Sequence, residues 1–245
     1  MSYMQTSGYL KRRGEIETYF DRTALAAWEK LTSDAPVGRI RATVRAGRDA
    51  MRATLLAMLP EDLSGMRVLD AGCGTGALAL AAARRGADVL AIDLSPQLVT
   101  LAERRIAGMS LHGRIAFRAG DMLDETLGRF DFAVAMDSLI HYRRDDAVAA
   151  LARLAPRIDR SILFTFAPRT RALAMMHVVG SAFPRGNRAP SIEPQPERLL
   201  RSAIALRPEL ARFAPARTQR IASGFYISQA LELSRQARGA EAGAA

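Results

Sequence analysis

Three glycines in alternate positions follow an apolar segment and can bring the backbone close to a ligand. The run from Val68 to Gly76 reads VLDAGCGTG, and an alanine- and leucine-rich stretch that predicts a helix comes next. Gly72, Gly74 and Gly76 lack a Cβ, so the chain can turn sharply there. Dinucleotide-binding folds use a similar turn, but their third glycine would fall at Ala79, a residue that is sometimes allowed. The loop predicts a cofactor site without choosing the cofactor.

Two aspartates at the ends of later apolar segments indicate which kind of cofactor the loop binds. Asp93 lies about twenty residues after the glycine loop, where a carboxylate can accept hydrogen bonds from both ribose hydroxyls. Leu94 and Ser95 follow it. Asp121 and Met122 end the next segment, where an acid and an apolar residue can bracket an adenine. Turn geometry alone explains neither acid, so the pattern predicts an adenosine-containing cofactor.

The run from Asp70 to Gly76 closely resembles the first motif of the class I S-adenosylmethionine-dependent methyltransferases. Asp93 and Asp121 fall where that superfamily contacts ribose and adenine. Arg45 is either a charge-assisted partner for the methionine carboxylate or an arginine that is solvated or stabilises the fold. The resemblance implies S-adenosylmethionine as cofactor and S-adenosylhomocysteine as product. The candidate cofactor-binding residues are Asp70, Gly72, Cys73, Gly74, Gly76, Asp93, Leu94, Ser95, Asp121, Met122, Asp137 and Arg45.

The fourth apolar segment ends in the run from Met136 to Tyr142, which the same resemblance places nearest the transferred methyl group. Amino-methylating enzymes of nucleic acids carry Asn or Asp, Pro-Pro and an aromatic residue here, whereas this chain has Ser138 and Leu139. Enzymes that methylate carbon 5 of a pyrimidine need a cysteine nucleophile, but the single cysteine, Cys73, lies in the glycine loop. Both base-methylating chemistries are therefore excluded.

Six motifs are spread along nearly the whole chain: Tyr19-Phe20 with Trp28, Val44 to Arg48, Asp70 to Gly76, Asp137 to Tyr142, Phe164 to Thr170 and Ser223 to Tyr226. Together they resemble the magnesium protoporphyrin IX O-methyltransferases of bacteriochlorophyll synthesis. The resemblance implies methyl transfer to one propionate carboxylate of magnesium protoporphyrin IX, giving the monomethyl ester. A propionate with a pKa of about 4.3 is ionised near pH 7, so the enzyme mainly has to align the reactants.

His141 and Tyr19 are the candidate catalytic residues. His141 can hydrogen-bond the reactive carboxylate, or its neutral imidazole can ligate the porphyrin magnesium axially. Tyr19 lies in a leading helix that resembles the family's active-site cover, which would exclude water and order on ligand binding. The alternative for His141 is a structural histidine whose ring nitrogens are hydrogen-bonded within the protein. The alternative for Tyr19 is an aromatic residue that packs one helix against another.

The segment from Ala167 to Pro196 is rich in Pro, Arg and Met and interrupts the preceding rhythm of strands and helices. An irregular insert of this length is usually functional or disordered. Apolar side chains with arginines at the rim suit a flat macrocycle with two carboxylates, and a mobile surface helix is the alternative. The candidate substrate-binding residues are His141, Tyr142, Arg169, Met175, Met176 and Arg185.

Short apolar runs that alternate with amphipathic stretches must position these residues, and they predict a doubly wound α/β fold. The resemblance implies a seven-stranded, mostly parallel sheet. We expect a helical arm or lid at 1–60, a methyltransferase domain at 61–235 with a substrate-covering insert at about 167–200, and a disordered tail at 236–245. Buried parallel strands are expected at Met66–Ala71, Ala87–Ile92, Arg114–Arg118, Phe130–Met136 and Ser161–Phe166, helices at Ala77–Arg85, Pro96–Ala107, Asp145–Pro156 and Glu197–Leu206, and a terminal hairpin at Arg217–Ala222 and Phe225–Leu233.

The length and composition predict one soluble globular domain of a reduced, cytoplasmic compartment. One cysteine excludes disulfide scaffolds and zinc ribbons, so no protein-bound metal is expected. The net charge of +10 comes almost wholly from dispersed arginines, since only Lys11 and Lys30 are lysines, and this indicates compositional bias rather than a nucleic-acid site. The polar N-terminus and the absence of a ~20-residue apolar run predict neither a signal peptide nor a transmembrane segment.

Partners and competing functions follow from the resemblance and the charge. The resemblance implies magnesium protoporphyrin IX as substrate, hand-over from the porphyrin-binding subunit of magnesium chelatase, and peripheral contact with the photosynthetic membrane. The first alternative is a methyltransferase of another small molecule, such as a quinone precursor. The others are an RNA methyltransferase, which only the charge favours, and a cofactor-binding regulatory partner without catalysis.

Overall fold

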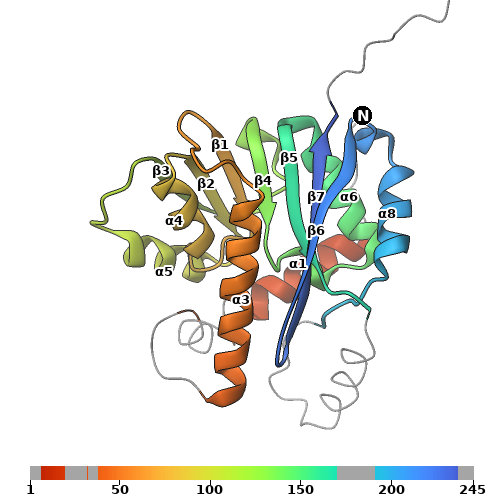
Figure 1. Cartoon of the computed structure of the whole chain (residues 1–245), viewed down its shortest axis with the longest axis horizontal. Coiled ribbons are helices and arrows are strands. Elements are labelled where there is room, and N and C mark those ends of the chain that lie inside the picture. The colour runs from red at the N-terminus through yellow and green to blue at the C-terminus, as the bar shows by residue number, and fades with distance from the viewer. Residues whose placement is uncertain (1–6, 20–31, 33–37, 170–190, 237–245) are drawn as a thin grey trace, which may run out of the picture.

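A twisted sheet with helices on both faces forms the molecule, shown in Figure 1. The computed structural model describes residues 7–19, 32, 38–169 and 191–236. The strands are β1 (Arg67–Ala71), β2 (Asp88–Asp93), β3 (Arg114–Ala119), β4 (Phe130–Ala135), β5 (Ile158–Phe166), β6 (Phe213–Ser223) and β7 (Tyr226–Arg235). The helices are α1 (Ser7–Thr18), α3 (Arg39–Ala57), α4 (Ala77–Arg84), α5 (Pro96–Ile106), α6 (Arg144–Leu154) and α8 (Glu197–Ala205), with single 3-10 turns η2 (Glu125–Leu127), η3 (Leu139–His141), η4 (Ala155–Arg157) and η6 (Pro208–Leu210).

The seven strands lie in the order β3-β2-β1-β4-β5-β7-β6. The first five are parallel, β7 runs antiparallel to β5, and β6 pairs with β7 as an antiparallel hairpin. The strand order reverses between β1 and β4, and ligands of open α/β sheets bind at such a point, beyond the carboxyl ends of the strands. The predicted seven-stranded, mostly parallel sheet with a terminal hairpin is confirmed.

Alternate side chains of the central strands enter two separate cores. Val68 of β1 packs with residues of α3 and α4, whereas Leu69 packs with residues of α1, α6 and α8. This alternation explains why the parallel strands are nearly continuous apolar runs, since helices cover both faces. The two layers leave the carboxyl edge of the sheet to the loops that follow the strands, and α1 contacts one of these loops.

The predicted strand over Arg114–Arg118 is present as β3, but the expectation that it is buried was wrong. Most of its side chains are half-buried or exposed. It lies at the edge of the sheet, and the link from β3 to β4 contains the single turn η2 where a crossover helix would cover its second face. Two strands also begin earlier than the sequence predicts: β5 begins three residues before Ser161, and β6 begins four residues before Arg217.

Helix α3 lies directly against the terminal hairpin (Figure 1). Gly47 makes this close approach possible, because a Cβ added there would lie 2.5 Å from Cδ1 of the Tyr226 ring. At the end of the hairpin, the Ser223 hydroxyl donates a hydrogen bond to the Thr43 carbonyl at 3.0 Å. The N-terminal half of the chain is thereby fixed to the last two strands.

No helix within the described ranges is long and apolar enough to cross a membrane. The predicted tail falls outside those ranges, except for its first residue.

The packing of Gly47 generates a stability prediction. Gly47→Ala should lower the free energy of unfolding by about 1–3 kcal/mol, because the new methyl group overpacks a buried contact. Gly14→Ala in α1 is the matched control, since nothing lies within 4 Å of a Cβ there. The control should be neutral or raise stability by up to about 1 kcal/mol through helix propensity. Urea unfolding of both variants measures the difference, and equal effects would contradict the packing account.

Candidate active site

The glycine loop between β1 and α4 is held by the neighbouring strand β2. Gly72, Gly74 and Gly76 all have a positive φ, between 54° and 88°, which residues with a side chain rarely adopt. The amide of Gly72 donates to the Ile92 carbonyl at 2.8 Å, and the amide of Gly74 donates to Oδ2 of Asp93 at 2.8 Å. The loop is therefore held at the carboxyl edge of the sheet by bonds from its own amides to β2.

Two carboxylates, the buried Asp70 and the half-buried Asp93, lie beside this loop. Burial raises the pKa of Asp70 to about 7, against a hydrogen bond from the Ala79 amide that lowers it. Oδ2 of Asp70 has no hydrogen-bond partner among the described residues. Burial also raises the pKa of Asp93, although the Gly74 and Ser95 amides both stabilise its charged form. Each carboxylate can therefore gain from a polar or positively charged ligand.

Side chains of α6 and η4 stabilise the loop after β3, which carries Asp121 and Met122. Arg153 donates to the Leu123 carbonyl at 3.2 Å, and Arg157 donates to the Met122 carbonyl at 3.3 Å. Oδ1 of Asp121 accepts the Leu123 amide at 2.9 Å. The loop is thus tied down on the side away from the glycine loop.

Helix α1 packs onto this same loop. The buried Tyr9 donates to Oδ1 of Asp121 at 3.1 Å, and Arg13 forms an ion pair with Oδ2 at 3.1 Å. The Tyr9 ring stacks on Tyr142, with centroids 5.0 Å apart. Arg12, on the same face of the helix, pairs with Glu193 at 3.1 Å. One face of α1 therefore bridges two regions that the sequence assigns to cofactor and substrate.

Asp137 follows β4 and lies with its carboxylate almost fully buried. It accepts hydrogen bonds from Tyr226 at 3.1 Å and from Ser228 at 3.3 Å. Arg48 of α3 forms an ion pair with it at 2.6 Å, and Thr165 donates at 3.2 Å. The sequence-based role of Asp137 in cofactor binding stays a prediction, since its side chain faces these protein partners.

His141 and Tyr142 lie beside the chain that returns from the insert. Nδ1 of the buried His141 is 3.4 Å from the Ser191 carbonyl oxygen. The Glu193 amide donates to the Ile140 carbonyl at 2.9 Å, and the Gln195 side chain donates to the Tyr142 carbonyl at 3.1 Å. These bonds place the C-terminal end of the insert directly against His141.

Both ends of the insert are close together. The Gln195 amide donates to the Ala167 carbonyl at 2.8 Å, and the Arg169 amide donates to the Gln195 carbonyl at 3.1 Å. The exposed Arg169 thus begins the insert near His141. The candidate residues Met175, Met176 and Arg185 lie outside the described residues.

The structure brings most candidate residues to one edge of the sheet and adds others. Cys73 is buried in the glycine loop, Leu94 and Ser95 follow Asp93, and Ser95 caps α5. Arg45 and Tyr19 are half-buried, on α3 and directly after α1. Sequence reasoning missed the roles of Tyr9, Arg13 and Arg48, although Arg48 and Tyr226 both lie in motifs that it singled out.

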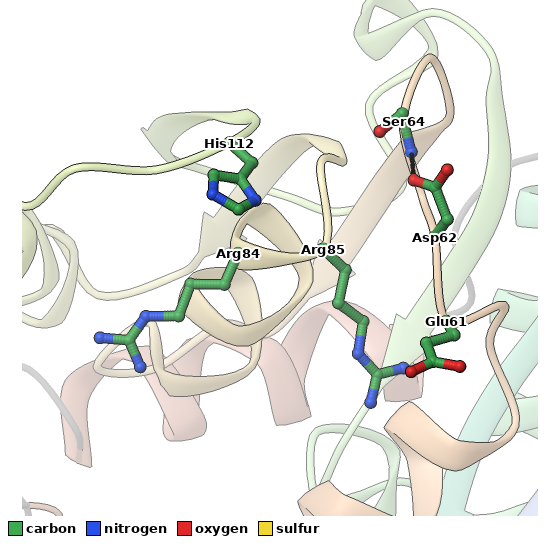
Figure 2. A pocket seen from close by; sticks show the side chains of 6 residues that line it. All are labelled: Glu61, Asp62, Ser64, Arg84, Arg85 and His112. Atoms are coloured by element: carbon green, nitrogen blue, oxygen red, sulfur yellow. Dashed lines mark hydrogen bonds between the residues drawn. The ribbon is translucent and has the colours of Figure 1, made fainter.

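A separate hollow of about 430 Å³ lies at the opposite, amino edge of the sheet (Figure 2). Arg85 there donates to the Leu56 carbonyl, and Figure 2 shows Arg84 and Arg85 pointing apart. Its charged groups therefore support local structure rather than converge on a ligand. Within the part of the chain that the structure describes, no three His, Cys, Asp or Glu side chains gather in a way that would hold a metal ion. The hollow is lined by Glu61, Asp62, Ser64, Arg84, Arg85 and His112.

Two families match different halves of the chain. The family described as Magnesium-protoporphyrin IX methyltransferase C-terminus matches residues 135–235, and the family described as Methyltransferase domain matches residues 68–158. The first range contains Asp137, His141 and Tyr226, and the second contains the glycine loop. The two matches together cover the whole open edge of the sheet.

Individual relatives cover nearly the full length. The magnesium-protoporphyrin O-methyltransferase of Rhodobacter capsulatus is 47% identical over 227 residues, which are 92% of this chain and 98% of that protein. The crystal structure of magnesium protoporphyrin IX methyltransferase from Synechocystis with bound SAH is similar with a TM-score of 0.77 at 29% identity, covering 91% of this chain and 100% of that one. A ubiquinone biosynthesis O-methyltransferase of Xanthomonas oryzae is 39% identical over 134 residues, 51% of this chain and 55% of that protein. The high identity over both full lengths shows that the chain belongs to the magnesium-protoporphyrin O-methyltransferase family.

Proposed function

We propose that this chain transfers the methyl group of S-adenosylmethionine to a propionate carboxylate of magnesium protoporphyrin IX, giving the monomethyl ester and S-adenosylhomocysteine. The observation that carries the proposal is the 47% identity to the Rhodobacter capsulatus enzyme over 98% of its length. A quinone precursor is a weaker candidate acceptor, because the identity to the ubiquinone enzyme extends over only 51% of the chain.

The described residues fit the cofactor. The two carboxylate oxygens of Asp93 accept amides at 2.8 and 3.0 Å, and each keeps a lone pair for a ribose hydroxyl. We assign the buried Oδ2 of Asp70 and the glycine loop to the methionine part. Asp121 and Met122 are assigned to adenine, and Arg45 to the methionine carboxylate. The full set is Asp70, Gly72, Cys73, Gly74, Gly76, Asp93, Leu94, Ser95, Asp121, Met122, Asp137 and Arg45.

The proposed reaction depends more on aligning the carboxylate with the methyl group than on proton transfer. The cofactor, when bound, supplies a methyl group on a positively charged sulfur. A propionate with a pKa of about 4.3 is ionised near neutral pH, so no side chain has to remove a proton. The protein residues hold the carboxylate in line and exclude water, and such alignment can contribute up to about 7–11 kcal/mol. The attraction between opposite charges is stronger in a site from which water is excluded.

We assign His141 to the porphyrin magnesium. The Ser191 carbonyl oxygen can only accept a hydrogen bond, so it favours the neutral tautomer with the proton on Nδ1. Nε2 then carries the lone pair, which suits an axial magnesium ligand. Contact with a carboxylate would require a proton on Nε2 as well, and therefore the charged imidazolium. A backbone carbonyl that orients a metal-binding histidine is the usual supporting arrangement.

The insert is the proposed cover of the porphyrin. Its described ends meet beside His141 and Tyr142, so the intervening residues start and finish at the proposed acceptor site. Arg169 and Arg185 are assigned to the propionates, and Met175 and Met176 to the macrocycle. A guanidinium group binds a carboxylate with two parallel hydrogen bonds, which suits this role.

Helix α1 is the proposed lid, with the N-terminal residues 1–60 as a helical arm and Tyr19 at the active site. The Tyr9 and Arg13 contacts with Asp121 support a lid that closes over the adenine region. A closed lid would keep water from the sulfonium group.

Cytoplasmic hand-over of porphyrin from the magnesium chelatase subunit and peripheral contact with the photosynthetic membrane belong to the proposal.

The first test is direct. The protein is incubated with S-adenosylmethionine labelled in the methyl group and with magnesium protoporphyrin IX, and we expect one labelled ester in the porphyrin. Metal-free protoporphyrin IX, a quinone precursor and transfer RNA serve as competing acceptors. Label in a competing acceptor but not in the magnesium porphyrin, with cofactor binding shown by calorimetry, would contradict the function.

His141→Ala should lower turnover by roughly 10- to 100-fold, because the porphyrin loses its orienting ligand. It should also abolish the shift in the porphyrin absorption spectrum that axial ligation produces. His112→Ala is the matched control, since His112 is exposed at the opposite edge of the sheet. Near-normal turnover and porphyrin affinity in His141→Ala would refute the assignment.

The lid is tested by limited proteolysis. S-adenosylhomocysteine should protect the first 40 residues of the protein from cleavage, and the double variant Tyr9→Phe/Arg13→Met should lose this protection because it cannot bond to Asp121. Lys11→Met is the control, since this exposed residue lies on the same helix. Identical cleavage rates with and without the ligand in the unaltered protein would rule out a lid.

A further inference from the structure

Four side chains from three elements distant in sequence converge on the Asp137 carboxylate. Arg48 comes from α3, Thr165 from β5, and Tyr226 and Ser228 from β7. The Arg48 and Tyr226 contacts each span 89 residues of sequence. The carboxylate is only 6% exposed, so these donors replace the water that would otherwise solvate its charge.

The backbone at Asp137 is held in an unfavourable conformation. Among the described residues it alone, apart from glycines, has a positive φ, at 55°. Asp tolerates this left-handed region better than most residues, but the conformation still has to be stabilised by its surroundings. The Asp137 amide donates to the Thr165 hydroxyl at 2.7 Å, so backbone and side chain are fixed by the same group of residues. The hydrogen-bond network therefore stabilises a strained turn.

That turn sets the position of two parts of the site. The next residue, Ser138, lies against the glycine loop, because a Cβ on Gly72 would come within 2.5 Å of the Ser138 Cβ. The turn η3 then follows and ends at His141. A change in the backbone at Asp137 would therefore move the support of the cofactor loop and the proposed porphyrin ligand together.

We propose that Arg48 and Tyr226 are positioning residues for methyl transfer, acting through Asp137 to hold the turn that places both the glycine loop and His141. The proposal rests on the proposed function for the identity of the methyl acceptor. It explains why two motifs far apart in the sequence, Val44 to Arg48 and Ser223 to Tyr226, meet beside the site. Arg48 here does not need to touch either substrate.

The experiment compares Arg48→Met, Arg48→Lys and Tyr226→Phe with a matched ion pair elsewhere. Arg217 pairs with Glu232, whose side chain is also 6% exposed, but this pair joins β6 to β7 away from the described site residues. Arg48→Met should lower kcat by about 10- to 100-fold. Tyr226→Phe should cause a smaller loss, and Arg48→Lys should recover part of the activity by keeping the charge. Arg217→Met should lower the melting temperature while kcat stays within about twofold of its original value.

Ligand binding separates positioning from direct contact. S-adenosylhomocysteine carries the amino-acid carboxylate, and 5′-methylthioadenosine lacks it. A displaced loop should weaken both ligands by a similar factor in Arg48→Met, measured by calorimetry. Loss of affinity for S-adenosylhomocysteine alone would overturn the proposal, because it would indicate that Arg48 binds the carboxylate directly. A fall in melting temperature with unchanged kcat and unchanged affinities would overturn it as well.

These readouts remain informative if the methyl acceptor differs. A failure of the proposed function appears in the unaltered protein as missing porphyrin ester. A failure of the positioning role appears as unchanged affinity for both adenosine ligands in Arg48→Met. The two failures are therefore distinguished by different measurements.

Discussion

The hydrogen bond from the Gly74 amide to the half-buried Asp93 carboxylate is the contact on which the site depends. It joins the loop after β1 to the end of β2, and it forms because a carboxylate partly removed from water needs donors close by. The loop can donate this bond only with glycines at positive φ, and Gly72 in turn leaves room for Ser138 after β4. One half-buried charge thereby arranges the ends of three parallel strands.

Three aspartates along the carboxyl edge of the sheet are each stabilised by hydrogen-bond donors, and the donors differ from one aspartate to the next. Asp93 is satisfied by backbone amides, Asp121 by side chains of α1 together with a backbone amide, and Asp137 by side chains of α3, β5 and β7. Each carboxylate therefore attaches a different part of the chain to the sheet. For a member of the magnesium-protoporphyrin O-methyltransferase family, this arrangement connects both ends of the chain to the region where cofactor and substrate are proposed to meet.

Sequence reasoning succeeded where a signal is local. Apolar runs predicted the five parallel strands and the terminal hairpin, and the glycines predicted the loop. It failed for β3, whose apolar residues indicated burial, because the absence of a crossover helix above a strand is a property of the assembled layers. It also singled out Arg45 rather than Arg48, because arginines one helical turn apart lie on the same face and only their tertiary partners distinguish them. Tyr9 carried no motif at all.

The sequence by itself determined the α/β sheet, the cofactor loop and the family resemblance, because hydrophobic periodicity and short motifs are properties of neighbouring residues. Only the tertiary structure decided which donors satisfy the buried carboxylates. Arg48 and Tyr226 reach Asp137 across 89 residues in either direction, and Tyr9 reaches Asp121 across 112. Such pairs depend on how helices and strands pack against one another, and a buried charge selects its partners only when that packing has excluded water.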